Sequence, residues 1–334
     1  MKKTGFVSAV VVALLFLFGQ LTVFAGEIKW KAQTSFPPMD SGTVHQAQGM
    51  VKVTNEALKG KLATTFFQVG QIVPEAEMGA ALSHGVFDAA YMPPMARTEA
   101  GNIAFGLPFS WDSFDDVIEF YYDYGFLDWF RKHEEKYNIF VGCPLPWGPV
   151  TLFSNFPVNK LEDYKGKKIW AWGLMAAVVE AFGAKPVMFD PGEVYMALKL
   201  GTIDGVLWGP AELETVKIKE VIKYISLPAI LDPLVFDWSI NMDSWKKLSP
   251  DTQQTYVKVM KENIRPMYDR IAIENNIGFK KAEEYGVKTI HLSPEEAIRL
   301  KKVARETWDV QAAKNPANAE AVAMLRKFLE EKGK

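Results

Sequence analysis

The chain has 334 residues, of which 49% are hydrophobic, and its 38 basic and 40 acidic side chains give a formal net charge of −2. No block of like charge interrupts this balance, so the composition favours neither a nucleic-acid-binding protein nor one held on a charged membrane surface. Two lobes are expected, because single hydrophobic cores stop growing at about 250–300 residues. The only cysteine, Cys143, lies in an apolar, strand-like run and is predicted to be buried and chemically inert.

The N-terminal segment predicts export. Lys2 and Lys3 precede an apolar run from Val7 to Phe18, and the small residues Val23 and Ala25 form a cleavage site. We therefore predict a signal peptide that is cleaved after Ala25, which places the mature protein in the periplasm. No cysteine stands directly at the cleavage site, which disfavours a lipid anchor, and no later apolar run reaches the about 20 residues of a membrane helix, so we expect a soluble exported protein.

The first elements after this segment predict an α/β fold. In "EIKWKAQTSF", Ile28, Trp30 and Ala32 alternate with polar neighbours, which is the period of a half-buried strand. The next segment, "TVHQAQGMVKVTNEALKG", carries apolar residues at helical spacing and ends at Gly60. Strands that alternate with helices along the chain are typical of α/β proteins.

Two distant segments share one pattern. "ALSHGVFDAA" and "ALKLGTIDGV" both read A-L-x-x-G-x-x-D followed by a small residue. Each predicts a helix that ends at a glycine, Gly85 or Gly201, and a strand that begins at the aspartate, Asp88 or Asp204. One such unit in each lobe would make the two lobes similar in construction.

The remaining helices are predicted from their first residues. Asp190 is placed to cap a helix that begins at Pro191. A helix from Pro250 to about Tyr285 has about 35 residues, which is too long for one lobe, so we expect it to run along both. Two further C-terminal helices are predicted to start at Ser293-Pro294 and Asn315-Pro316.

Two extended, proline-containing segments are predicted to cross between the lobes. They are "GCPLPWGPVTLFSN", residues Gly142 to Asn155, and "LPAILDPLVFDWSIN", residues Leu227 to Asn241. A chain that changes lobe twice through extended segments has natural hinge points there.

No catalytic or metal-binding motif is present. The sequence contains no GxSxG, P-loop, GxGxxG or HExxH pattern, and "DSFDD" reads as a helix cap in which Ser113 and Asp116 form a capping box. The four histidines fall in separate elements, which disfavours a zinc site; they are His45, His84, His133 and His291. We therefore predict no enzyme, no catalytic residues, no metal and no cofactor.

The chain resembles a known family over nearly its whole mature length. The segments "EDYKGKKIW", "GAKPVMFDPGEVYMALKLGTIDGVLWGPAE" and "KEVIKYISL" are similar to the DctP family, the extracytoplasmic solute-binding proteins of TRAP transporters. "FQVGQ", "GVFDAAYM" and "GLPFSWDS" resemble further conserved-looking stretches of that pattern. The resemblance implies a two-lobed, periplasmic-binding-protein-like fold, in which each lobe is a β-sheet flanked by helices and crossing strands and a long helix join the lobes.

The resemblance also implies a domain division and partners. Residues 1–25 are the signal peptide, residues 26–148 with about 238–275 form lobe I, and residues 149–237 with about 276–334 form lobe II. Such proteins close on a small solute and deliver it to the small and large membrane subunits of a TRAP permease. An alternative with the same fold is a sensor subunit that presents its ligand to a histidine kinase or chemoreceptor. We expect a monomer, although some relatives swap a C-terminal helix, here Pro316 to Glu331, to dimerise.

One position departs from the family pattern. Relatives carry an arginine in the strand after "KGxK", where its guanidinium holds a ligand carboxylate through two parallel bonds. This chain has Trp170 there, in "KGKKIW". Tryptophan offers an apolar face and one N–H donor, so it stacks on a solute but cannot neutralise an acid. We expect Trp170 to face the cleft and Trp172 to face the core or solvent.

The other predicted ligand-binding residues are mostly aromatic. Trp147 lies on the first crossing segment, and Trp208 follows Leu207, which stands where the keto-acid branch of the family has a metal-binding glutamate. Arg97 is the cation closest to a position where some relatives bind an acid. The rest of the predicted shell is Phe36, Gln68, Tyr91, Phe109, Met188 and Phe189. These residues predict a small organic solute that is aromatic or has an apolar face, organic acids included.

Overall fold

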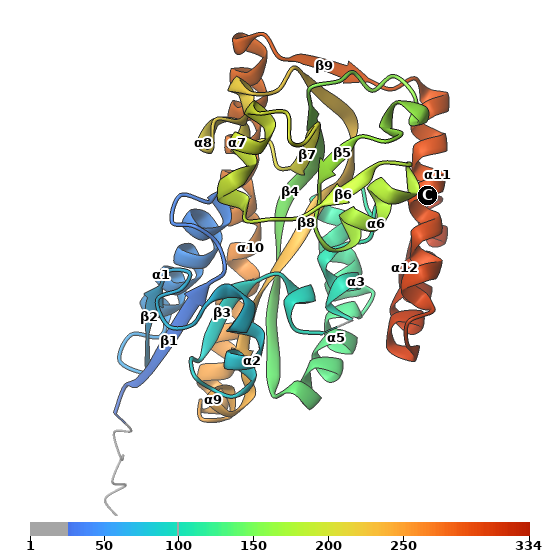
Figure 1. The fold of residues 1–334 in the computed structure, drawn as a ribbon. Coiled ribbons are helices and arrows are strands. Elements are labelled where there is room, and N and C mark those ends of the chain that lie inside the picture. Colours follow the sequence, from blue (N-terminus) through green and yellow to red (C-terminus); the bar gives the residue numbers. More distant parts are fainter. Residues whose placement is uncertain (1–25, 99) are drawn as a thin grey trace, which may run out of the picture.

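The computed structural model describes residues 26–98 and 100–334, so the predicted signal peptide lies outside the described residues. In the described chain, nine strands form one mixed sheet in the order β2-β1-β3-β8-β4-β7-β5-β6, with β9 paired to β8 (Figure 1). The strands of its first half run parallel and are β1 (Ile28–Thr34), β2 (Leu62–Phe67) and β3 (Ala89–Met92). The strands of its second half also run parallel and are β5 (Lys168–Trp170), β6 (Lys185–Val187) and β7 (Gly205–Trp208).

Two long strands join the halves. β4 (Ile139–Ser154) and β8 (Tyr224–Asn241) pair antiparallel over their whole length, and both contain the segments predicted to cross between lobes. β8 pairs with β3 on one side, and β4 pairs with β7 on the other. We call the half built on β1 to β3 the first lobe and the half built on β5 to β7 the second lobe. The two-lobed α/β prediction is confirmed.

The shared sequence pattern has the same structural role in both lobes. Asp88 donates its backbone N–H to Lys31 O and accepts the Lys31 N–H at Oδ2, at 2.8 and 2.7 Å. Asp204 makes the same two bonds with Lys168, also at 2.8 and 2.7 Å. Each aspartate thus ties the start of its strand to the neighbouring parallel strand. This explains why the pattern recurs and confirms that the lobes are built alike.

Short helices cover the two halves of the sheet. Those of the first lobe are α1 (Gln48–Ala57), α2 (Met78–Ser83), α3 (Gly101–Phe105), α4 (Phe114–Ile118) and α5 (Phe126–Glu134). A π-helical turn, η1 (Thr43–Ala47), leads into α1. Those of the second lobe are α6 (Gly173–Ala181), α7 (Val194–Lys199) and α8 (Glu212–Thr215), and Asp190 caps the turn before α7 as predicted.

A long helix supports both lobes. α10 (Pro250–Tyr285) has 36 residues, begins after Ser249, whose side chain accepts the Thr252 N–H, and packs on α1, β4 and α8 (Figure 1). A Cβ on Gly278 would lie 1.9 Å from the carbonyl oxygen of Pro210, so glycine permits the close approach of α10 to the second lobe. The predicted span along both lobes is confirmed.

The C-terminal helices also touch both lobes. α11 (Pro294–Ala312) packs on α6, and α12 (Pro316–Glu331) packs on α3 and α5 of the same chain. Trp308 of α11 donates its Nε1–H to the Pro108 carbonyl of the first lobe at 3.0 Å. These helices therefore connect the lobes, although the predicted division assigns them to the second.

The single cysteine lies in the protein interior, as predicted. Cys143 is fully buried, and burial raises the pKa of its thiol above the ordinary range, which agrees with an inert side chain. Within residues 26–98 and 100–334, the helices all fall short of the length or apolarity needed to cross a membrane.

Candidate functional site

The two lobes meet face to face beside the crossing strands. Met95 of the first lobe reaches Gly173 at the start of α6, where a Cβ would lie 2.5 Å from the Met95 Cε. Glu75 of the first lobe faces Asp190 of the second, and the pKa of Glu75 is raised, first by burial and then by this like charge. The structure thus has the lobes in contact at Met95 and Gly173, while Glu75 and Asp190 lie at the exposed edge of this contact.

A first aromatic cluster lies where the crossing strands meet the first lobe. Phe36 lies 5.5 Å from Tyr91 and 4.8 Å from Phe236, measured between ring centroids, and Trp147 lies 6.0 Å from Phe236. The Tyr91 hydroxyl donates to Gln46 Oε1 at 2.7 Å, which fixes the ring. The structure therefore brings together three predicted residues, Phe36, Tyr91 and Trp147. It adds Phe236 of β8, which the sequence analysis did not single out.

A second cluster consists of three tryptophans of the second lobe. Trp170 lies 5.0 Å from Trp172 and 5.3 Å from Trp208, between ring centroids. β5 ends at Trp170, and Trp172 is the residue that caps α6, so the backbone turns and brings the two rings together. Trp172, expected to face the core or solvent, is therefore half-buried beside Trp170.

The indole N–H of Trp170 is already used inside the protein. It donates to the Phe189 carbonyl in the loop after β6 at 3.1 Å, and only 5% of Trp170 is exposed. Gln33 holds the corresponding loop of the first lobe, because its side-chain amide donates to the Val73 carbonyl in the loop after β2 at 2.8 Å. Trp170 thus anchors the loop after β6 through its only N–H donor.

Arg97 is paired on several sides. Its guanidinium donates to both oxygens of Asp237 at 2.9 and 2.6 Å and to Glu134 at 3.1 Å, and its side chain is 1% exposed. Although burial opposes it, Asp237 and Glu134 raise the pKa of Arg97 above its usual range. One arginine with two carboxylates leaves this buried triad with a formal excess of negative charge.

The other predicted residues are dispersed. Met188 is 74% exposed, and Phe189 is half-buried and supplies the carbonyl that holds Trp170. Phe109 is 8% exposed, with a backbone φ of 56°, and its carbonyl accepts from Arg305 of α11 at 2.9 Å. Gln68 keeps a buried Oε1 without a protein partner.

Within the described part of the chain, three buried polar atoms beside the tryptophan cluster also lack protein partners. They are Trp147 Nε1, Thr151 Oγ1 and Glu212 Oε2. Thr151 pairs with Trp208 across β4 and β7, so the two side chains share one face of the sheet. A Cβ on Gly209 would lie 2.0 Å from Trp147 Cη2 and 2.9 Å from Glu212 Oε2, so glycine lets the ring and the carboxylate approach each other. Buried polar atoms normally have partners, so this region has hydrogen-bonding groups that the described protein atoms leave unsatisfied.

An acidic cluster accompanies these atoms. Glu212, 2% exposed, has its pKa raised well above the ordinary range, first by burial and then by the charge of Asp40. Burial, and to a lesser extent Glu274 of α10, raises the pKa of Asp40 to about 6. Glu274 accepts from the Ser41 hydroxyl and lies 2.6 Å from His45 Nε2. Across the described residues, the structure shows no group of three or more acidic, histidine or cysteine side chains arranged to hold a metal ion.

The sequence analysis missed Asp40 and Glu212. Asp40 follows two prolines in "PPMD" and Glu212 ends "GPAE", so the only local signal was an acidic residue just after each turn. Asp40 belongs to the first lobe, Glu212 to the second and Glu274 to the helix between them. The fold brings them to α10, where Glu274 accepts from Ser41, next to Asp40, and Asn275 accepts the N–H of Ala211, next to Glu212.

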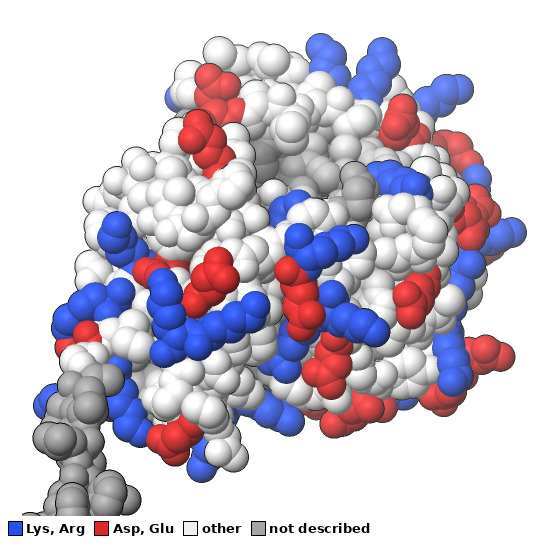
Figure 2. All heavy atoms as spheres, turned by 90° about the horizontal axis from the view of Figure 1, so that it is seen from below, with Lys and Arg blue, Asp and Glu red and all other residues white. Residues whose placement is uncertain are grey.

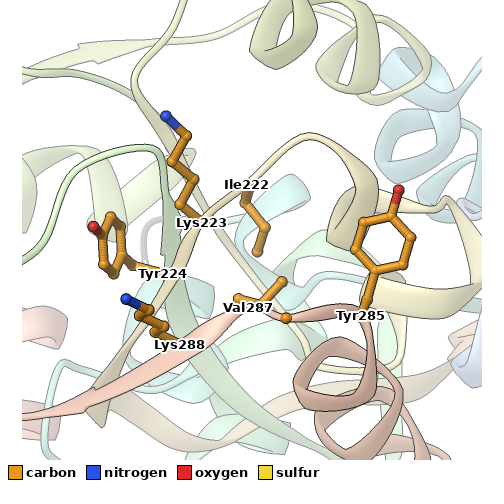
Figure 3. A pocket seen from close by; sticks show the side chains of 7 residues that line it. Ile222, Lys223, Tyr224, Tyr285, Val287 and Lys288 are labelled. Carbon is orange, nitrogen blue, oxygen red and sulfur yellow. The ribbon is translucent and has the colours of Figure 1, made fainter.

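Two surface cavities lie away from this region. One of about 270 Å³ lies between the start of β8 and the end of α10, where Figure 3 shows the Lys223 side chain on one side and the Tyr285 side chain on the other, with Ile222 and Val287 between them. Another of about 520 Å³ lies beside the start of α12 and is lined by His133 and Glu320 among others. A small-molecule site needs polar groups that converge, which the first cavity lacks. Figure 2 also shows acidic and basic side chains interspersed on the face it presents, with no broad field of one sign.

Comparison with known proteins identifies the family. The model of the family "Bacterial extracellular solute-binding protein, family 7" (DctP) matches residues 35–315. A monocarboxylate 2-oxoacid-binding periplasmic protein of Nostoc sp. is 22% identical over 308 residues, which cover 90% of this chain and 84% of that protein.

Solved structures share the fold. A TRAP transporter solute-binding protein of Bordetella bronchiseptica, with copurified calcium and picolinate, matches with a TM-score of 0.84 at 22% identity, covering 92% of this chain and 93% of that one. A TRAP periplasmic solute-binding protein of Chromohalobacter salexigens with bound (S)-(+)-2-amino-1-propanol matches with a TM-score of 0.78 at 22% identity, covering 91% and 96%. These proteins bind solutes and are not enzymes. The chain therefore belongs to family 7 of the bacterial extracellular solute-binding proteins, the DctP family of TRAP transporters.

Proposed function

We propose that this protein captures a small organic solute with an aromatic or apolar face between its two lobes and delivers it to the small and large membrane subunits of a TRAP transporter. The observation that carries this proposal is that Trp147 of the first aromatic cluster packs on Gly209, next to Trp208 of the second, beside buried polar atoms that lack partners in the described chain. Apolar rings supply most of the contact area in such sites, and a few polar groups fix the orientation of the solute.

An organic acid is the second candidate, and the names of relatives favour it. The Nostoc protein is named for 2-oxoacids, and the Bordetella structure holds picolinate. The chemistry of the site speaks against it, because Arg97 is paired with Asp237 and Glu134 and Trp170 replaces the arginine of the family pattern. A buried carboxylate without a cationic partner is costly.

We further propose that the moving bodies are residues 26–148 with about 238–275, and residues 149–237 with about 276–334, in a monomeric protein. Support comes from β4 and β8, which run through both lobes, and from α10, which packs on both. Hinges in solute-binding proteins are a few residues of such connecting elements.

Export is expected to produce a mature chain that begins at Gly26. Mass analysis of the protein expressed with its N-terminal segment in a Gram-negative host should give that terminus, with the product in the periplasmic fraction. A product that keeps Val7 to Phe18 and sediments with membranes would instead indicate a retained anchor.

The solute itself is expected to survive purification. Native mass spectrometry of the exported protein should show a complex heavier than the chain by the mass of one small organic molecule, which denaturation releases. A nonpolar face on the released molecule supports the proposal. Homogeneous solute-free protein that also shows no thermal shift with any small organic solute would contradict it.

A further inference from the structure

We propose that the polar end of the solute is an ammonium group with a hydrogen-bond acceptor beside it, held between Asp40 of the first lobe and Glu212 of the second. This inference rests on the proposed capture of a solute between the lobes and names its chemical class. It assigns a partner to Glu212 Oε2, which has none among the described residues.

The charges around the lobe junction favour a cation. Residues next to Asp40 and Glu212 meet neighbouring positions of α10, because Ser41 donates to Glu274 and the Ala211 N–H donates to Asn275 Oδ1 at 3.1 Å. In the described chain the recorded basic contact of these carboxylates is His45 on Glu274. Arg97 cannot compensate them, because Asp237 and Glu134 already hold it. An anion entering here would meet several carboxylates, whereas an ammonium ion would neutralise them.

The hydrogen-bonding groups also fit such a solute. Asp40 Oδ1 is used by the Thr43 N–H at 2.9 Å, while Glu212 Oε2 is buried and unpartnered. An ammonium group has three N–H donors and can bridge two carboxylates. The six-membered ring of Trp147 lies beside Glu212, and the Nε1–H of the same indole is a buried donor without a partner in the described chain, so it calls for an acceptor on the solute. The rings of Tyr91, Trp147 and Phe236 suit a cation through their electron-rich faces.

This arrangement makes binding depend on pH with a definite sign. In the solute-free protein the pKa values of Asp40 and Glu212 are raised, so part of this pair is protonated near pH 6. A bound ammonium favours the ionised forms and expels protons, so affinity rises with pH up to the pKa values of the free protein. The groups that face the pair are Glu274, His45, Tyr91 and, beyond Tyr91, Asp237.

The test uses solutes matched in size that differ in one group. The first set is 2-amino-1-propanol, propane-1,2-diol and lactate, and the aromatic set is tyramine, tyrosol and 4-hydroxyphenylacetate. Titration calorimetry is expected to show saturable binding by an amine of at least one set, with proton release revealed by two buffers of different ionisation enthalpy. The matched alcohol and acid should bind at least about tenfold more weakly.

Carboxylate variants distinguish a loss of charge at the site from a general loss of folding. Glu212→Gln should weaken amine binding about tenfold to a hundredfold and reduce proton release, because it keeps the shape and removes the charge. Glu214→Gln is the matched control, since Glu214 lies on the same helix, is exposed and pairs with Lys219. It should change affinity by less than about twofold. Asp40→Asn carries the test if Glu212→Gln does not fold.

Four results would overturn the inference. The first is that the alcohol or the acid binds as tightly as the matched amine or more tightly, and the second is that neither Glu212→Gln nor Asp40→Asn weakens amine binding. The third is that Ca²⁺ alone gives a thermal shift that Glu212→Gln removes. The fourth is that the copurified solute contains no nitrogen and that no amine binds. Tight binding of lactate or 4-hydroxyphenylacetate with closure of the lobes would reject the inference that the solute carries an ammonium group, but it would leave the proposed capture of a solute intact. If no solute binds or closes the lobes, both the ammonium inference and the proposed capture of a solute are rejected.

Discussion

Replacing Arg97 with methionine is expected to lower the free energy of unfolding by about 3–5 kcal/mol. The side chain is 1% exposed and bonds both oxygens of Asp237 and one of Glu134, so its removal leaves two buried carboxylates without a cation. Urea denaturation followed by tryptophan fluorescence measures this change directly.

The matched control is Arg265→Met. Arg265 pairs with Asp269 at 2.7 Å, but both side chains are more than half exposed, so the expected change is below about 1 kcal/mol. Asp237→Asn with Glu134→Gln in the Arg97→Met protein should recover part of the loss. If Arg97→Met folds with near-normal stability and loses solute binding, Arg97 contacts the solute after all.

Trp170→Ala is expected to lower the free energy of unfolding by about 3–5 kcal/mol and, separately, to weaken solute binding by about 1–3 kcal/mol. The stability loss comes from the buried ring between Trp172 and Trp208 and from the bond to Phe189 O. The affinity loss comes from the ring face. Denaturation and calorimetry with the copurified solute measure the two effects.

Trp308→Ala separates these effects. Trp308 is 2% exposed and donates to Pro108 O at 3.0 Å, but it lies on α11, away from both aromatic clusters. Its loss should destabilise the protein similarly but remove no ring from either aromatic cluster, so affinity should fall less than with Trp170→Ala. Tight binding of succinate by the unmodified protein, unaffected by Trp170→Ala, would contradict the role given to Trp170.

The sequence predicted the framework well because local signals and the fold agree. The A-L-x-x-G-x-x-D pattern located Gly85 and Gly201, which have φ of 71° and 70°, and the aspartates that tie neighbouring strands. The crossing strands and the capped long helix were equally visible, because proline, strand residues and cap residues act within a few positions.

The polar part of the candidate site was not predictable in the same way. Asp40 and Glu212 are 172 positions apart and meet only after both lobes form on one sheet. The pairing of Arg97 with Asp237 spans 140 positions, so the sequence could not show that this cation is already engaged. The aromatic candidates were easier to predict from the sequence, because a tryptophan in place of the family arginine replaces a charged group with an apolar ring.

Closure of the lobes around the solute is tested most directly by small-angle scattering. The protein is unfolded and refolded to strip its solute and then measured with and without the molecule identified by native mass spectrometry. Solute between the lobes should reduce the radius of gyration in step with saturation, and stabilise the fold in proportion to ln(1 + [L]/Kd). An unchanged radius of gyration at full saturation would contradict capture between the lobes.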